Sequence, residues 1–95
     1  MYLGSYSFEG DPTELTAGYE RLIAHFPPET MDLHVCIRTD TGLTVMDACP
    51  SREVFEEFSA STDFHSVISA CGLPEPKVQG LGTVHHARLR APVTP

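Results

Sequence analysis

Apolar and polar residues alternate along four segments of the chain, and two longer segments between them carry apolar residues three and four positions apart. A period of two predicts strands, and spacings of three and four predict helices. The order is strand, helix, strand, strand, helix pair, strand. With 95 residues the chain is long enough for one domain and too short for two. We therefore predict one α+β domain over residues 1–90, followed by a flexible tail at 91–95.

The predicted strands are bounded by turn-forming residues. The first covers residues 2–8. The second and third cover 33–38 and 43–49, and residues 39–42 between them, Thr-Asp-Thr-Gly, are typical of a tight hairpin turn. The last is predicted for residues 77–89. Together they predict a four-stranded antiparallel sheet in a βαββαβ chain.

The helices carry start and stop signals. Asp11 can cap the first helix, and Pro27 with Pro28 ends it. Ser51 can cap the next segment, which breaks near residues 59–62 and restarts until Gly72. The pattern predicts two short helices here, although one kinked helix would fit equally well.

Neither face of the predicted sheet is clearly polar. Along the second strand, Leu33, Val35 and Ile37 alternate with the semi-apolar His34 and Cys36. A solvent-exposed face would instead carry regular polar positions. The helices of a βαββαβ chain cover one face only, because both crossovers are right-handed. We therefore expect a second copy of the chain to cover the other face, giving a homodimer.

The order of elements, the hairpin at residues 33–49 and the helical segments 51–58 (SREVFEEF) and 61–64 (STDF) resemble the dimeric α+β barrel superfamily. Within this ferredoxin-like group the chain is most similar to antibiotic-biosynthesis-monooxygenase-like domains. The likeness spans residues 2–88. It implies a dimeric α+β barrel and, for any catalysis, cofactor-free oxygenation or cyclase-type proton transfer on an aromatic or polyketide-like compound.

The chain also departs from this family pattern. Relatives commonly carry a Trp near the end of the third strand, where this chain has Cys49 and Pro50. The haem-degrading branch uses Asn, Trp and His together, and this sequence contains no Trp. Haem is therefore not expected as a ligand.

Charge and composition narrow the set of partners. The net charge is −7 with six Lys and Arg residues, which argues against binding to nucleic acid or an anionic membrane. No apolar run approaches the roughly 20 residues of a membrane helix, so we expect a cytoplasmic protein. The three cysteines form no Cys-x-x-Cys pair and are expected to be small buried hydrophobic residues.

The candidate catalytic residues are His34, His85, His86 and Asp47. An imidazole titrates near neutral pH and can act as an acid or base. His85 and His86 are neighbours on the predicted last strand, so one should face the helices and the other the partner sheet. Asp47 lies within an apolar strand and needs a partner, either Arg38 or a histidine of the last strand. Alternatively, each histidine is half-buried with a backbone partner, and Asp47 forms a structural ion pair.

Gly80 and Gly82 are unexpected inside a strand, and they predict either a bulge or, on one shared face, space for an aromatic ring or ligand. Tyr6 and Phe64 are the predicted pocket-lining residues. His, Cys and Asp side chains could also ligate a metal, but their spacing matches no compact motif, so we expect neither metal nor cofactor. The rival hypothesis is a non-catalytic dimeric binding or interaction module. A cavity of about 300 Å³ with converging polar groups would favour a ligand site, and a collapsed core would favour the rival.

Overall fold

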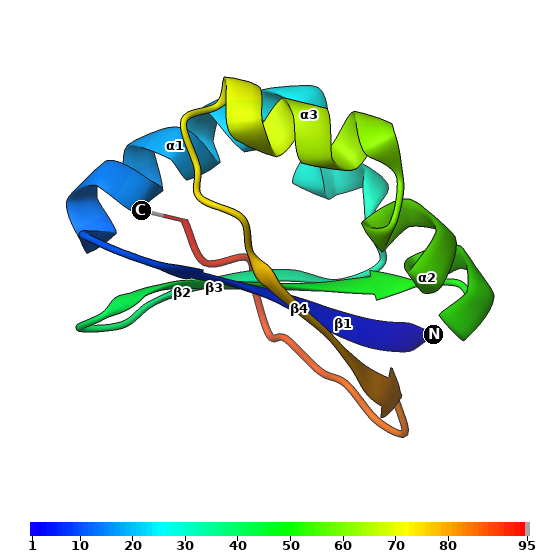
Figure 1. Ribbon diagram of the computed structural model, residues 1–95. Coiled ribbons are helices and arrows are strands. Elements are labelled where there is room, and N and C mark those ends of the chain that lie inside the picture. Colours follow the sequence, from blue (N-terminus) through cyan, green and yellow to red (C-terminus); the bar gives the residue numbers. More distant parts are fainter. Residues whose placement is uncertain (95) are drawn as a thin grey trace.

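A computed structural model of the chain describes residues 1–94. It contains one antiparallel sheet in the order β2-β3-β1-β4. All three α-helices lie on the same side of this sheet (Figure 1), so the predicted α+β, ferredoxin-like βαββαβ architecture is confirmed. The elements are β1 (Tyr2–Glu9), α1 (Pro12–His25), the 3-10 turn η1 (Pro28–Thr30), β2 (His34–Arg38), β3 (Gly42–Cys49), α2 (Arg52–Ser59), α3 (Thr62–Ala70) and β4 (Lys77–Thr83).

Side-chain caps begin the helices where the sequence predicted them. The side chains of Asp11, Ser51 and Ser61 each accept a hydrogen bond from the backbone N–H three residues later, at 3.1 or 3.2 Å. The cap at Ser61 separates α2 from α3, so the prediction of two short helices is confirmed. Gly72 follows α3 with φ +79°, a left-handed conformation suited to glycine. None of the described helices is both long and apolar enough to cross a membrane.

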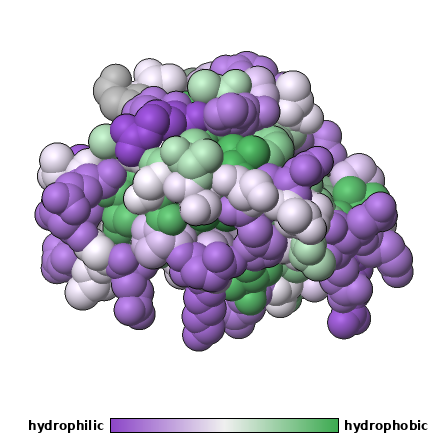
Figure 2. Space-filling model, turned by 45° about the horizontal axis from the view of Figure 1, so that its top comes forward, coloured by the Kyte–Doolittle hydropathy of each residue, from purple (hydrophilic) through white to green (hydrophobic). Residues whose placement is uncertain are grey.

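The core lies between the helices and one face of the sheet. Tyr6, Phe8, Leu43 and Val45 point from β1 and β3 toward the helices and are at most 4% exposed. Seen from the helical side, the outer surface is mainly hydrophilic, with smaller hydrophobic areas between the polar residues (Figure 2). The helix residues that complete the core are Leu15, Tyr19, Leu22, Phe55, Phe64 and Ile68.

The last strand is shorter than predicted. It ends at Thr83, which lies opposite Tyr2 in β1, and the next residue, Val84, donates one more hydrogen bond to the carbonyl of Met1 at 2.8 Å. Beyond that point β1 offers no further backbone partner. His85 and His86 are therefore exposed and outside the strand, so their predicted strand positions were wrong.

The final segment has no helix or strand from residue 84 to residue 94. In Figure 1 its first part turns back below the strands, and its last part, in red, crosses them in this view. Its apolar side chains stay in solvent, with Leu89 63% and Val93 86% exposed. Of the tail predicted at 91–95, residues 91–94 are exposed and form neither helix nor strand, and Pro95 lies outside the described residues.

A β-bulge in β4 explains its two glycines. Gly80 pairs with Gly4, whereas Gly82 pairs with Leu3 and has φ +148°. Leu3 and Gly4 are neighbours in β1 and point to opposite faces. The bulge is therefore confirmed, and the predicted shared face of the two glycines was wrong. A Cβ on Gly80 would clash with the hydroxyl of Tyr2, so an aromatic ring of the chain itself fills that space.

The sheet face opposite the helices carries apolar side chains. In β2, Val35 and Ile37 point to this face, whereas His34 points to the opposite one. Val35 and Ile37 are each 38% exposed. Met46 in β3 lies opposite Val35 and is partly exposed. No described helix covers this face (Figure 1). Apolar side chains thus lie on both faces of the sheet, as the sequence pattern predicted.

Candidate functional site

A narrow pocket lies between the helices and the sheet, with a volume of about 30 Å³. Two polar side chains, His34 and Asp47, enter it from β2 and β3. Most of the remaining wall is aromatic or aliphatic. The aromatic residues are Tyr6, Phe8, Tyr19, Phe26, Phe58 and Phe64.

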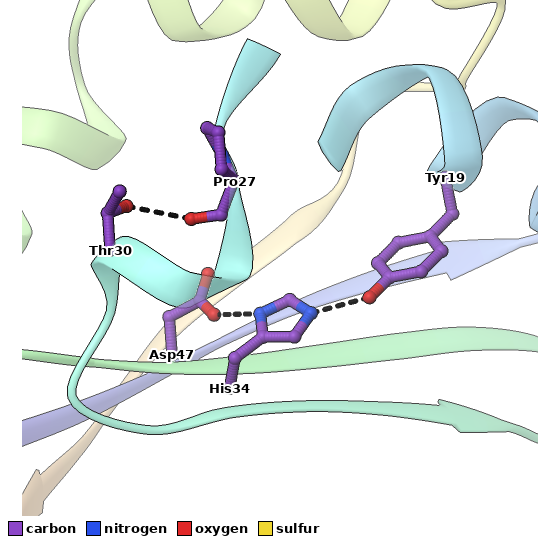
Figure 3. Close-up of polar contacts among 5 residues, drawn as sticks. All are labelled: Tyr19, Pro27, Thr30, His34 and Asp47. Atoms are coloured by element: carbon purple, nitrogen blue, oxygen red, sulfur yellow. Dashed lines mark hydrogen bonds and ion pairs between the residues drawn. The ribbon is translucent and has the colours of Figure 1, made fainter. Parts of the chain in front are cut away.

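His34 links two other side chains in a hydrogen-bonded chain across this pocket. The β2–β3 register places His34 opposite Asp47, so both side chains point to the same face of the sheet. The distance from His34 Nδ1 to Asp47 Oδ1 is 2.5 Å, and that from His34 Nε2 to Tyr19 Oη is also 2.5 Å. Figure 3 shows the three side chains in line, from β3 through β2 to α1. The side chains of His34 and Asp47 are only 13% and 14% exposed.

The direction of these hydrogen bonds follows from the groups involved. An ionised carboxylate can only accept, so His34 Nδ1–H donates to Asp47. A neutral imidazole then has Nε2 free to accept the hydroxyl proton of Tyr19. Burial raises the pKa of Tyr19, and the neighbouring Cys36 raises it further, so Tyr19 remains a phenol near neutral pH.

These three hydrogen-bonded side chains can therefore remove a proton from a bound molecule. A group that donates to the hydroxyl oxygen of Tyr19 can transfer its proton while Tyr19 passes its own to His34. The carboxylate of Asp47 stabilises the imidazolium so formed, as the carboxylate does in Ser-His-Asp sites. No phenolate is needed as a lasting species. This combination is a general base in an apolar pocket.

The structure brings together two of the predicted catalytic residues. His34 and Asp47 form an Asp–His pair, but the partner of Asp47 is the histidine of β2 rather than Arg38 or a histidine of the last strand. His85 and His86 lie exposed beyond β4 and do not line the pocket. The prediction that they lie in the last strand, with one of them facing the helices, was wrong because β4 ends at Thr83.

Tyr19 is the functional candidate that the sequence reasoning missed. It lies three or four residues from other apolar residues of α1, and such spacing predicts a core position. Its ring does pack in the core, at 9% exposure, and stacks on the His34 ring with centroids 5.8 Å apart. A tyrosine within an apolar stripe needs a partner for its hydroxyl, and this requirement was the available signal.

Of the predicted ligand-binding residues, Tyr6 and Phe64 share the pocket, with ring centroids 5.1 Å apart. Gly80 and Gly82 do not line it. They border a separate, open surface groove beside the start of α2, together with Tyr2 and other residues. A Cβ on Gly80 would meet Tyr2 and Phe55, and neither of these residues lines the aromatic pocket.

Among the described residues, no group of three or more His, Cys, Asp or Glu side chains could hold a metal ion. The three cysteines are free. Burial raises the pKa of the Cys36 thiol to about 11 and also raises that of Cys49. Both thiols therefore stay protonated near neutral pH and are poor nucleophiles.

His65 illustrates the structural role that any histidine could have had. Its Nε2 lies 2.8 Å from the carbonyl oxygen of Ser59, and its Nδ1 lies 2.5 Å from Glu75 Oε1. These contacts connect α3 to the end of α2 and to the segment before β4. His65 does not line the pocket.

Comparison with known proteins supports the architecture. No protein-family model and no curated protein sequence matches this chain. A crystal structure from Deinococcus radiodurans, of a protein provisionally assigned as an antibiotic biosynthesis monooxygenase, is similar with a TM-score of 0.63 and 9% identity, covering 96% of this chain and 100% of that one. A variant of SnoaB, a cofactor-independent oxygenase from Streptomyces nogalater, is similar with a TM-score of 0.56 and 15% identity, covering 95% of each chain. The chain has the fold of these antibiotic-biosynthesis-monooxygenase-like structures, as its sequence predicted.

A double-mutant cycle tests the Asp47–His34 contact. We expect His34→Ala and Asp47→Ala each to lower the free energy of unfolding by about 1–3 kcal/mol, because each leaves a partly buried polar partner unpaired. The double variant should lose less than the sum, by about 1 kcal/mol or more. Urea denaturation measures all three, and His25→Ala, at an exposed position on α1, is the control. Strictly additive losses would contradict the contact.

Proposed function

We propose that the pocket binds a small aromatic or polyketide-like compound and that His34 and Asp47, acting through Tyr19, remove a proton from it. The reaction would be cofactor-independent oxygenation or a cyclisation. The observation that carries the proposal is the hydrogen-bonded Asp47–His34–Tyr19 chain in an otherwise apolar pocket. The likeness in fold to a cofactor-independent oxygenase adds support for the reaction class.

Both reactions begin with the same proton transfer. Loss of a proton from a CH₂ group beside an aromatic ketone gives an electron-rich carbanion that O₂ can oxidise. The CH₂ becomes a carbonyl, one oxygen atom enters the product and the other leaves as water. In a cyclisation, the carbanion would instead attack a carbonyl of the same molecule. In either case the apolar wall around Tyr19 strengthens its interaction with the reacting group.

Ligand entry requires side chains to move. A cavity of about 30 Å³ has room for one or two water molecules, far less than an aromatic ring needs. Met31 and Phe26 line the pocket and are only half-buried, so they form its outer rim. Met31 is unbranched and flexible, and its displacement is the least costly way to enlarge the space.

The small cavity supports a second candidate function. A non-catalytic dimeric binding or interaction module would keep its pocket filled by its own side chains. The Asp47–His34–Tyr19 chain would then serve to hold β2, β3 and α1 together. This alternative predicts a stable protein that binds no aromatic compound, which separates it from the enzyme.

We also propose that the chain works as a homodimer joined through the sheet face that carries Val35 and Ile37. Each of these side chains is 38% exposed, and no described helix covers them. A second copy related by a twofold axis would place the same apolar patch against itself. Burying this face would add hydrophobic stabilisation to a small domain.

Oxygen uptake tests the proposed reaction. In the presence of quinol- and anthrone-type aromatics, we expect the protein to consume O₂ and to show a raised melting temperature. His34→Gln should lower the rate at least about 100-fold, because general-base catalysis contributes this much or more. His25→Gln, a substitution at an exposed histidine, should leave the rate unchanged. The absence of both a thermal shift and O₂ uptake across a broad panel would count against the enzyme and for the non-catalytic module.

Sedimentation equilibrium tests the dimer. We expect twice the chain mass of 10.4 kDa at micromolar concentration. The pair Val35→Asp and Ile37→Asp should give a monomer, since two charges would have to be buried in the interface. Val54→Asp is the matched control, because Val54 is also exposed, at 43%, but lies on α2. A wild-type monomer in dilute solution would overturn the dimer.

A further inference from the structure

Tyr6 has a buried hydroxyl without a partner. Its side chain points from β1 into the pocket and is 3% exposed. The ring packs against Phe55 and Phe64, with centroids 6.0 and 5.1 Å away. Its oxygen Oη is fully buried and makes no hydrogen bond with any of residues 1–94. A phenylalanine would satisfy the same packing without the cost of an unpaired hydroxyl.

Asp47 leaves an acceptor in the same pocket. Its Oδ1 accepts from His34, while no side chain or backbone group of the described residues donates to its Oδ2. In the β1–β3 register, Asp47 is opposite Gly4 and Tyr6 is opposite Val45. Tyr6 and Asp47 therefore lie diagonally on the same face of adjacent strands. At this diagonal spacing the backbones of the two residues are about 7–8 Å apart, so both side chains can reach one small group between them.

Tyr6 acts as a donor in this setting. Burial raises the pKa of Tyr6, and the negative charge of Asp47 raises it further, so the phenol keeps its proton. The same negative charge disfavours any anionic group nearby. A neutral hydroxyl is the group that suits both sides, since it can accept from Tyr6 and donate to Asp47.

We propose that Tyr6 and Asp47 Oδ2 together bind a neutral hydroxyl group of an aromatic ligand and thereby select hydroxylated aromatics over their ethers and carboxylates. The inference rests on the proposed function, because it places the ligand in the same pocket, and it names Tyr6 as a specificity-determining residue. Tyr19 and His34 remain the proton-accepting side of the site. A methyl ether loses the hydrogen bond to Asp47, and a carboxylate meets like charge.

Binding of matched naphthalenes tests this inference. We measure dissociation constants of 2-naphthol, 2-methoxynaphthalene and 2-naphthoate by calorimetry, for the wild type, Tyr6→Phe and Tyr2→Phe. Tyr2 is on the same strand and face as Tyr6, packs on Phe55 and does not line this pocket. For the wild type and for Tyr2→Phe, we expect 2-naphthol to bind about tenfold or more tightly than its ether, and 2-naphthoate to bind weakest. In Tyr6→Phe the ligand oxygen loses its donor, so the affinity for 2-naphthol should fall at least threefold, whereas Tyr2→Phe should leave it unchanged.

The outcomes separate the two proposals. Wild-type binding with equal affinity for alcohol and ether, or a 2-naphthol affinity that Tyr6→Phe leaves unchanged, would overturn the proposed hydroxyl site while leaving the aromatic pocket standing. Failure of the wild type to bind any of the three compounds would overturn both. The ligand-free Tyr6→Phe variant should melt at the same temperature as the wild type or higher. A clear drop would mean that the hydroxyl has a structural partner, which would also overturn the inference.

Discussion

The hydrogen-bonded chain from Asp47 through His34 to Tyr19 joins β3, β2 and α1 across the inner face of the sheet. β2 is an edge strand whose single neighbour in the sheet is β3, and its outward-pointing residues are half in solvent. Its inner face is fixed by His34, which bonds to β3 on one side and to α1 on the other. Three polar side chains inside an apolar layer are costly unless each satisfies the next. Their mutual pairing makes one arrangement of the two strands and the helix more stable than its alternatives, and it forms the base that we propose at the pocket wall.

The two faces of the sheet carry different kinds of side chain. The inner face carries a close-packed set of aromatic rings, and at its centre two polar positions, Tyr6 and Asp47, retain hydrogen-bonding capacity that the chain itself does not use. The outer face has no chemistry of this kind. Its exposed Val35 and Ile37 form an apolar surface of the kind that contacts other proteins. The proposed proton-transfer site on one face and the proposed association surface on the other can coexist in a domain this small because the sheet separates them.

Local signals in the sequence were sufficient for most of the fold. Helix caps at Asp11 and Ser51, the break between the two short helices and the alternation along the hairpin act over a few residues, and all appear as predicted. The errors concern features set by partners distant in sequence. The length of β4 depends on where β1 begins, and the face of Gly82 depends on a bulge. His85 and His86 were misplaced for the first reason. Tyr19 was missed because periodicity identifies a core position and does not reveal what its hydroxyl meets.

The protonation of His34 is the most direct measure of the central claim. Nitrogen-15 NMR of the histidine side chains, with His34 assigned by its loss in His34→Gln, distinguishes the two ring nitrogens. For the neutral ring we predict the proton on Nδ1, held by Asp47, with Nε2 bare as the acceptor for Tyr19. A proton on Nε2 instead, or rapid exchange between both forms as in an exposed histidine, would contradict the hydrogen-bonded chain and the base that depends on it.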